Sequence, residues 1–153
     1  MFSRPIRDVM EQRSLLTAPP ETTVSTAAKL MAKRNVGAVM VLDDRRLVGI
    51  FTERDAVFRV IARGLDYHTA RLADVMTTEP ITVAPDKLFG YALLVMHENG
   101  FRHLPVIENG QLIGVVCARN ALDPDLEEFV SESQRREHIL RERGLEVAQP
   151  PAR

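Results

Sequence analysis

The sequence predicts a mixed fold of helices and strands (α/β, α+β) made of two β-α-β-β-α repeats, with a C-terminal helix after the second. Two observations support this prediction. The phrase "GIFTERD" at 49–55 returns as "GVVCARN" at 114–120, with the same apolar run and changed polar residues. The offset of 65 residues between them (49 to 114) also aligns most of the remaining chain. A succession of matching elements at one offset indicates an internal repeat better than a single short motif does.

Each repeat contains a set of apolar residues with the i, i+3, i+4, i+7 spacing of one helix face. The sets are Val24, Ala27, Ala28 and Met31 in the first repeat and Phe89, Ala92, Leu93 and Met96 in the second. Asn35 and Gly100 follow these sets. Both residue types tolerate the left-handed conformation that ends many helices, so we expect the helices to end there.

Two short apolar runs rich in β-branched residues follow each helix and predict a hairpin. In the first repeat they are "GAVMVL" (37–42) and "LVGIF" (47–51), joined by the turn signal "DDRR". In the second they are "HLPVI" (103–107) and "LIGVV" (112–116), joined by "ENGQ". Thr52 is then expected to begin a helix that runs to about Arg63, before Gly64. Ahead of the repeats, "RDVM" at 7–10 matches "ADVM" at 73–76.

The composition excludes several classes of function. The chain of 153 residues has 45% apolar and 27% charged residues, as ordinary globular proteins do. A net charge of −1 gives no general attraction to nucleic acid or to anionic membranes. No run approaches the roughly 20 apolar residues of a membrane span, and the N-terminus lacks an apolar secretion signal, so we expect a cytoplasmic protein.

Catalytic and metal sites find no support in the sequence. The single cysteine, Cys117, excludes a disulfide framework and a four-cysteine zinc site, and we expect it to be a buried strand residue. The four histidines share no metal-ligand spacing. The segment "HENGF" at 97–101 begins like a metalloprotease helix but lacks the second histidine. We therefore expect neither enzyme activity nor an obligatory cofactor.

The tandem pattern "DVM … ITVAPD … GFRHLPVIENGQLIGVV", with "GIFTERD" closing the first copy, resembles a pair of CBS domains, the regulatory module named after cystathionine β-synthase. The resemblance covers residues 4–123 and implies CBS domains at 4–65 and 71–123, related by a pseudo-twofold axis. It further implies two clefts that bind adenosine-containing ligands such as AMP, ADP, ATP or S-adenosylmethionine, in a module that is not itself catalytic.

The segment "TERD" at 52–55 carries the clearest functional signal. By the resemblance, Asp55 binds the ribose, and Thr52 is the hydroxyl residue that precedes it. A fixed carboxylate can accept hydrogen bonds from two hydroxyls, and the start of a helix suits a phosphate. The same Thr-x-x-acid spacing also predicts a capping box, in which Asp55 only closes the helix start. Both roles are compatible, because one carboxylate has several lone pairs.

The resemblance brings residues of the second copy to the same cleft. Ile81 and Thr82 would lie beside the base together with Thr77, Phe101 would cover it, and Arg102 and His103 would reach the phosphates. Plain core packing for Phe101, and a solvated strand edge for the two cations, remain the alternatives. The complete set of ligand-binding candidates is Thr52, Arg54, Asp55, Thr77, Ile81, Thr82, Phe101, Arg102 and His103.

The opposite cleft departs from the family pattern. It would combine residues of both copies, namely Asn120, Cys117, Leu16, Thr17, Val36, Gly37 and Ala38. Asparagine offers one carbonyl acceptor where Asp55 has a carboxylate, cysteine replaces a hydroxyl, and Gly37-Ala38 supplies no cation. We therefore expect one functional cleft for each chain.

The last part of the chain is predicted to form a helix over 124–145 and a disordered tail over 146–153. Asp123 and Pro124 can begin this helix, and arginines near its end suit the helix dipole. Its apolar stripe is partial, so packing on the module or a second subunit and a solvated face both remain open.

Taken together, these features predict a regulatory sensor of adenosine nucleotides, with AMP or ATP as the favoured ligand and a role in energy sensing. We expect it to act as a homodimer on an unknown effector protein. The alternative is a structural module that also forms a dimer through its helices but binds no nucleotide.

Overall fold

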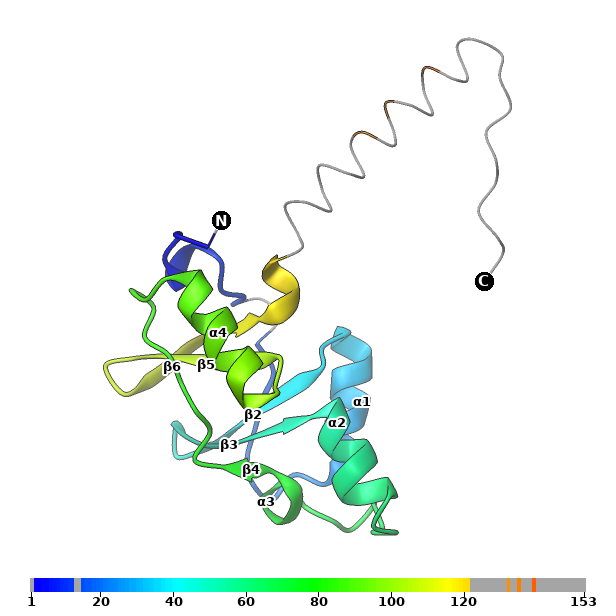
Figure 1. The fold of residues 1–153 in the computed structure, drawn as a ribbon. Helices are drawn as coiled ribbons and strands as arrows, with labels where there is room; N and C mark the ends of the chain where they lie inside the picture. The colour runs from blue at the N-terminus through cyan, green and yellow to red at the C-terminus, as the bar shows by residue number, and fades with distance from the viewer. Residues whose placement is uncertain (1, 13–14, 122–131, 133–134, 136–138, 140–153) are drawn as a thin grey trace. The chain divides into compact units, whose positions relative to one another are not determined.

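The structure, a computed structural model, describes residues 2–12 and 15–121 together with Glu132, Arg135 and Ile139 (Figure 1). The chain divides into two compact units, Met1–Ala118 and Arg119–Arg153. Apart from those three single residues, the helix predicted over 124–145 and the tail predicted over 146–153 lie outside the described residues.

The first repeat forms most of a four-stranded sheet in the order β1-β2-β3-β4. Its elements are β1 (Thr17–Ala18), α1 (Val24–Arg34), β2 (Ala38–Asp43), β3 (Arg46–Thr52), α2 (Glu53–Asp55) and the π-helix η2 (Ala56–Ile61). β1 pairs with β2 in parallel, and β2 pairs with β3 in an antiparallel hairpin. The predicted order of strand, helix, hairpin and helix is confirmed for this repeat.

The second repeat contributes α3 (Leu72–Val75), β4 (Thr77–Thr78), α4 (Phe89–Asn99), β5 (His103–Glu108), β6 (Gln111–Cys117) and the 3-10 helix η3 (Ala118–Ala121). β5 and β6 form a two-stranded antiparallel sheet, and a single parallel bridge between Val83 and Val106 corresponds to the pairing of β1 with β2. A short 3-10 helix, η1 (Ile6–Asp8), precedes both repeats.

The predicted helix ends and turns are confirmed. Asn35 and Gly100 cap α1 and α4 in the left-handed conformation, with φ of 53° and 70°. In the hairpin turns, pairs of adjacent residues have positive φ, as type I′ turns require. These residues are Asp44 (46°), Arg45 (65°), Asn109 (51°) and Gly110 (76°).

The helix predicted from Thr52 to about Arg63 is present but is α-helical for only three residues. From Ala56 to Ile61 it is a π-helix, and the backbone N–H of Ala62 donates to the carbonyl of Val57, five residues earlier, at 2.8 Å. The element ends before Gly64, whose φ is 66°. Apolar spacing alone does not distinguish this wider helix from an α-helix over so few residues.

The segment that leads into each repeat packs on the other repeat. β4, which leads into the second repeat, extends the first repeat's sheet, because Thr77 pairs with Ile50 and Thr78 with Gly49. In the reverse direction, Glu11 bridges to Val115 on β6. We call residues 2–12 and 71–78 the leading segments.

Two methionines of the leading segments lie over glycines in the opposite strands. A Cβ atom added at Gly49 would collide with the side chain of Met76, and one added at Gly114 would collide with that of Met10. The "DVM" phrases therefore have equivalent positions in the two halves, and the closeness of sulfur and backbone explains why each strand has glycine there.

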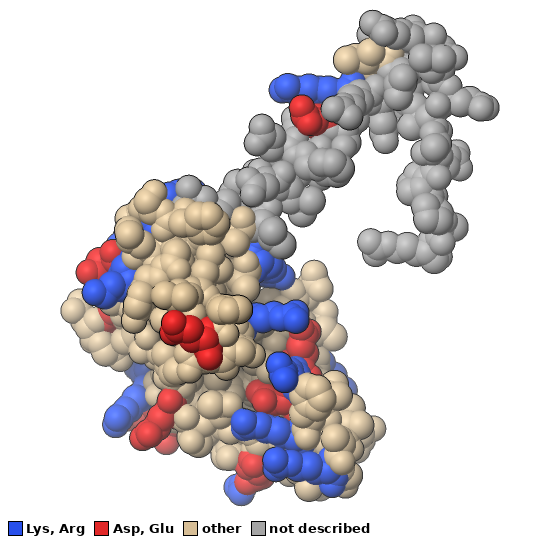
Figure 2. Space-filling view, viewed as in Figure 1, with Lys and Arg blue, Asp and Glu red and all other residues tan. Residues whose placement is uncertain are grey.

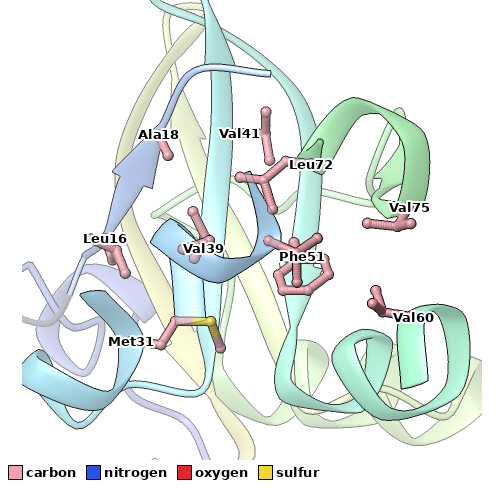
Figure 3. Packing of buried hydrophobic residues seen from close by; sticks show 11 residues of the cluster. Leu16, Ala18, Met31, Val39, Val41, Phe51, Val60, Leu72 and Val75 are labelled. Atoms are coloured by element: carbon pink, nitrogen blue, oxygen red, sulfur yellow. The ribbon is translucent and has the colours of Figure 1, made fainter. Parts of the chain in front are cut away.

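Alternation along β2 and β3 divides the buried residues between two cores. Val39, Val41 and Phe51 face α1, η2 and α3 in the larger core (Figure 3). Leu72 and Val75 of the second leading segment belong to this core, so the first repeat is completed by residues from outside it. The opposite side of the sheet packs against the second repeat through Ala38, Met40, Ile50, Val115 and Cys117, which we call the inter-sheet cluster.

Candidate functional site

The chain at the end of β3 fixes the carboxylate of Asp55. Thr52 is the last residue of the strand and the N-cap of α2. Its backbone N–H and its hydroxyl both donate to Oδ2 of Asp55, at 2.9 and 3.1 Å. The backbone N–H of Asp55 in turn donates to the Thr52 hydroxyl at 3.4 Å. This is the capping box that the spacing predicted, whereas the ribose-binding role of Asp55 stays a prediction.

The second carboxylate oxygen of Asp55 faces an arginine. Nε of Arg59 lies 3.4 Å from Oδ1, and the Asp55 side chain is only 14% exposed. Nη1 of Arg59 donates at 3.2 Å to the carbonyl oxygen of Val75, in the second leading segment. Arg59 was not among the site residues predicted from the sequence. The sequence feature that could have indicated its role is the spacing of four residues between Asp55 and Arg59. Acidic and basic residues with this spacing are common on the surfaces of helices.

The two residues between Thr52 and Asp55 are exposed and point to different neighbours. The guanidinium of Arg54 lies over the ring of Phe58, 5.1 Å from its centroid, in a cation–π arrangement. The backbone N–H of Glu53 donates to the carbonyl of Gly37 at 3.1 Å. Gly37 and Ala38, which the resemblance assigned to the opposite cleft, therefore lie beside Thr52 and Glu53 along the β2–β3 ladder.

The candidates of the second repeat fall in two places. Thr77 is on β4 and pairs with Ile50, two residues before Thr52 on the neighbouring strand. Ile81, which is 47% exposed, and Thr82 precede the bridge at Val83.

Phe101, Arg102 and His103 lie where α4 leads into β5. Phe101 is partly buried, and its backbone N–H closes the end of α4 by donating to the Met96 carbonyl at 3.1 Å. Arg102 is exposed, and its carbonyl accepts from the backbone N–H of Ala118 at 2.9 Å. His103 is partly buried and is paired with Cys117 across the strands.

The inter-sheet cluster connects these two groups of candidates. Thr52 is paired with Ala38 on β2, and His103 is paired with Cys117 on β6. Ala38 and Cys117 both belong to the inter-sheet cluster. The end of β3 and the start of β5 therefore flank the same apolar contact between the two sheets. Cys117 is 4% exposed, which confirms the prediction of a buried strand cysteine.

The described part of the chain has neither a cluster of metal ligands nor a membrane-spanning helix. Among those residues, no group of three or more histidine, cysteine, aspartate or glutamate side chains could hold a metal ion. No helix there is both long enough and apolar enough to span a bilayer. On the face shown in Figure 2, acidic and basic side chains are interspersed.

The structure is a tandem-repeat module. It has two copies of one strand-helix-hairpin unit, and the segment that leads into each copy packs on the other copy. The first copy carries a fixed carboxylate. The family model of the CBS domain matches residues 6–62 and 72–124. The chain belongs to the CBS domain family. Pairs of such domains are generally regulatory and not catalytic.

Relatives and solved structures agree with this assignment. A CBS domain-containing protein of Arabidopsis thaliana, CBSCBSPB3, is 44% identical over 102 residues, which are 66% of this chain and 18% of that relative. The chain thus spans about a fifth of the length of this relative. A crystal structure of a conserved protein from Pyrococcus horikoshii is 32% identical and has a TM-score of 0.76, covering 82% of this chain and 94% of that one.

A third neighbour contains a nucleotide. The CBS domain protein PAE2072 from Pyrobaculum aerophilum, complexed with AMP, is 26% identical, with a TM-score of 0.69. The similarity covers 76% of this chain and 89% of that one.

Proposed function

We propose that this chain is a regulatory module that binds an adenosine-containing ligand at the Thr52–Asp55 turn and passes the bound state to a partner protein. The observation that carries the proposal is the fixed Asp55 carboxylate, which is held by its own turn at the end of a strand. The AMP complex of PAE2072 supports the ligand class, and AMP or ATP is the ligand we favour. We place the protein in the cytoplasm.

The hydrogen bonds of Asp55 leave room for a ligand. A carboxylate has about four lone-pair sites. Oδ2 accepts two hydrogen bonds from Thr52, and Oδ1 faces Arg59, so about one site on Oδ1 remains for a ribose hydroxyl. Capping and ribose binding are therefore compatible at one side chain. Arg102 and His103 are the residues we propose for the phosphates, and Ile81, Thr82 and Phe101 are those we propose for the base.

Titration calorimetry with AMP and ATP tests this proposal, and we expect one strong site for each chain. The second repeat has Asn120 and Cys117 in place of Asp55 and Thr52, so a ligand there would lose a charged hydrogen bond and a hydroxyl partner. Each loss is worth about 1 kcal/mol or more, which together predict an affinity gap of tens-fold. Asn120→Ala should leave the strong site intact. Two equal sites, or loss of binding in Asn120→Ala, would show that the working cleft was assigned wrongly.

One observation favours the alternative, a structural module that acts through protein contacts alone. The outer face of η2 exposes Val57, Phe58 and Ile61, at 50%, 58% and 67%. Large apolar side chains gathered on one face indicate an interaction surface. In that case the capping box would be the whole role of Asp55, and calorimetry with adenosine ligands would give no heat of binding.

The same exposed face leads us to expect a homodimer under both functions. Light scattering at micromolar concentration should give twice the chain mass, and Ile61→Ser should shift the equilibrium toward the monomer because it removes apolar area from the contact. Tyr91→Ser, on α4 and 52% exposed, is the matched control and should leave the mass unchanged. A monomeric wild-type protein under these conditions would rule out the dimer.

A further inference from the structure

We infer that Arg59 is a positioning residue for the Asp55 carboxylate, which it holds in the orientation that accepts a ribose hydroxyl. The inference rests on the proposed function and extends it, because it assigns a second residue to the ribose site. Arg59 is not expected to touch the ligand. It acts through Asp55.

The guanidinium of Arg59 is held from two sides. Its Nε lies 3.4 Å from Oδ1 of Asp55, and its Nη1 donates to the Val75 carbonyl at 3.2 Å. The arginine side chain is 37% exposed and the aspartate side chain 14%. A planar guanidinium with two fixed partners has little freedom to turn, so it restricts the carboxylate that it faces.

The two oxygens of Asp55 are thus constrained separately. The Thr52 backbone and hydroxyl hold Oδ2 by hydrogen bonds, and Arg59 attracts Oδ1 in an ion pair. With both oxygens held, the carboxylate plane is fixed, and the remaining lone pair of Oδ1 has one direction. Without Arg59 the plane could rotate about the Thr52 contacts, and each bound ribose would have to order it again at an entropic cost.

The second repeat has neither member of this pair. At the offset of 65 residues, Asn120 stands where the first repeat has Asp55, and Pro124 stands where it has Arg59. Proline has no side-chain donor, and asparagine has no charge to pair with one. The carboxylate and its arginine therefore occur together in the first repeat and are both missing from the second.

Calorimetry on the full chain tests the inference with AMP and 2′,3′-dideoxy-AMP, which lacks both ribose hydroxyls. We expect Arg59→Gln to weaken AMP binding about five- to tenfold, as much as the loss of one hydrogen bond between the ribose and Asp55, and to leave dideoxy-AMP binding within about twofold. Arg59→Lys keeps the charge beside Asp55 and should recover part of the AMP affinity. In an Asp55→Ala background, Arg59→Gln should have no further effect, because residues that act through one group are not additive.

Three results would overturn the inference. Unchanged AMP affinity in Arg59→Gln would mean that Arg59 does not position the carboxylate. Equal weakening of both ligands would mean that Arg59 contacts another part of the nucleotide or only supports the fold. Full additivity with Asp55→Ala would show that Arg59 does not act through that carboxylate. If Arg59→Gln does not fold, Arg59→Lys takes its place. The inference then requires that Arg59→Lys weakens AMP binding more than it weakens dideoxy-AMP binding. Absence of AMP, ATP and dideoxy-AMP binding in the wild-type protein would instead refute the proposed function, and this inference with it.

Discussion

Asp55→Ala should weaken AMP binding by about 1.5–3 kcal/mol, because hydrogen bonds to a charged group contribute that much. The carboxylate is held by Thr52 at one oxygen and faces Arg59 at the other, so the wild-type protein does not have to order it on binding. The variant should stay folded, with a loss of about 1 kcal/mol of stability from the broken capping box. Calorimetry gives the affinity, and urea denaturation gives the stability.

A second aspartate that accepts from the backbone N–H at a helix start supplies the matched control. In α3, Oδ2 of Asp74 accepts from the backbone N–H of Arg71 at 3.0 Å, as Oδ2 of Asp55 accepts from Thr52. Asp74→Ala should therefore lower stability and leave AMP affinity unchanged. If Asp55→Ala behaves in the same way, with normal AMP affinity, then Asp55 is a helix cap and nothing more.

Leu72→Ala should lower the free energy of unfolding by about 2–5 kcal/mol, the usual cost of removing a fully buried leucine side chain. Leu72 is in the second leading segment, yet its side chain is 0% exposed in the core of the first repeat (Figure 3). The substitution leaves a cavity beside residues such as Phe51 that belong to the other repeat. Urea denaturation of the full chain, followed by circular dichroism, gives the value.

Leu94→Ala is the control for this experiment, because Leu94 is 52% exposed on α4. It should change stability by no more than about 0.5 kcal/mol. A change at Leu72 as small as the change at Leu94 would mean that the leading segment does not contribute to the core of the first repeat.

The sequence predicted the local parts of the fold well. Asn35 and Gly100 end helices as their residue types indicated, and the "DDRR" and "ENGQ" turns have the positive φ values that tight hairpins need. These features depend on a few neighbouring residues whose backbone preferences are strong. The offset of 65 residues then connected the two halves without any knowledge of contacts.

The exchange of leading segments was not predictable from local patterns. β4 is only two residues long, and the bridge at Glu11 is a single pair, so neither has the length that marks a strand in a sequence. The contact between Met76 and Gly49 was not predictable either, because a glycine within a strand does not indicate which side chain covers it. Such features depend on residues far apart in the chain.

The candidate site divides in the same way. The Thr52–Asp55 contact was predictable because the capping box is local. The bond from Arg59 to Val75 was not, since its partners lie on different elements and one of them is a backbone carbonyl, which every residue has. The cross-repeat grouping of Arg102 and His103 with Asp55 rests on the family pattern and stays a prediction.

The exchanged leading segments make folding of the two repeats interdependent. If the first repeat unfolds, Thr77 and Thr78 lose the strand that pairs with them, and Leu72 loses its core. If the second unfolds, residues 2–12 lose Val115 as their partner. Neither half can melt alone without exposing surface in the other, so we expect unit 1–118 to unfold in a single cooperative transition. A fragment carrying one repeat would have no such support and could regain it only by associating with a second fragment.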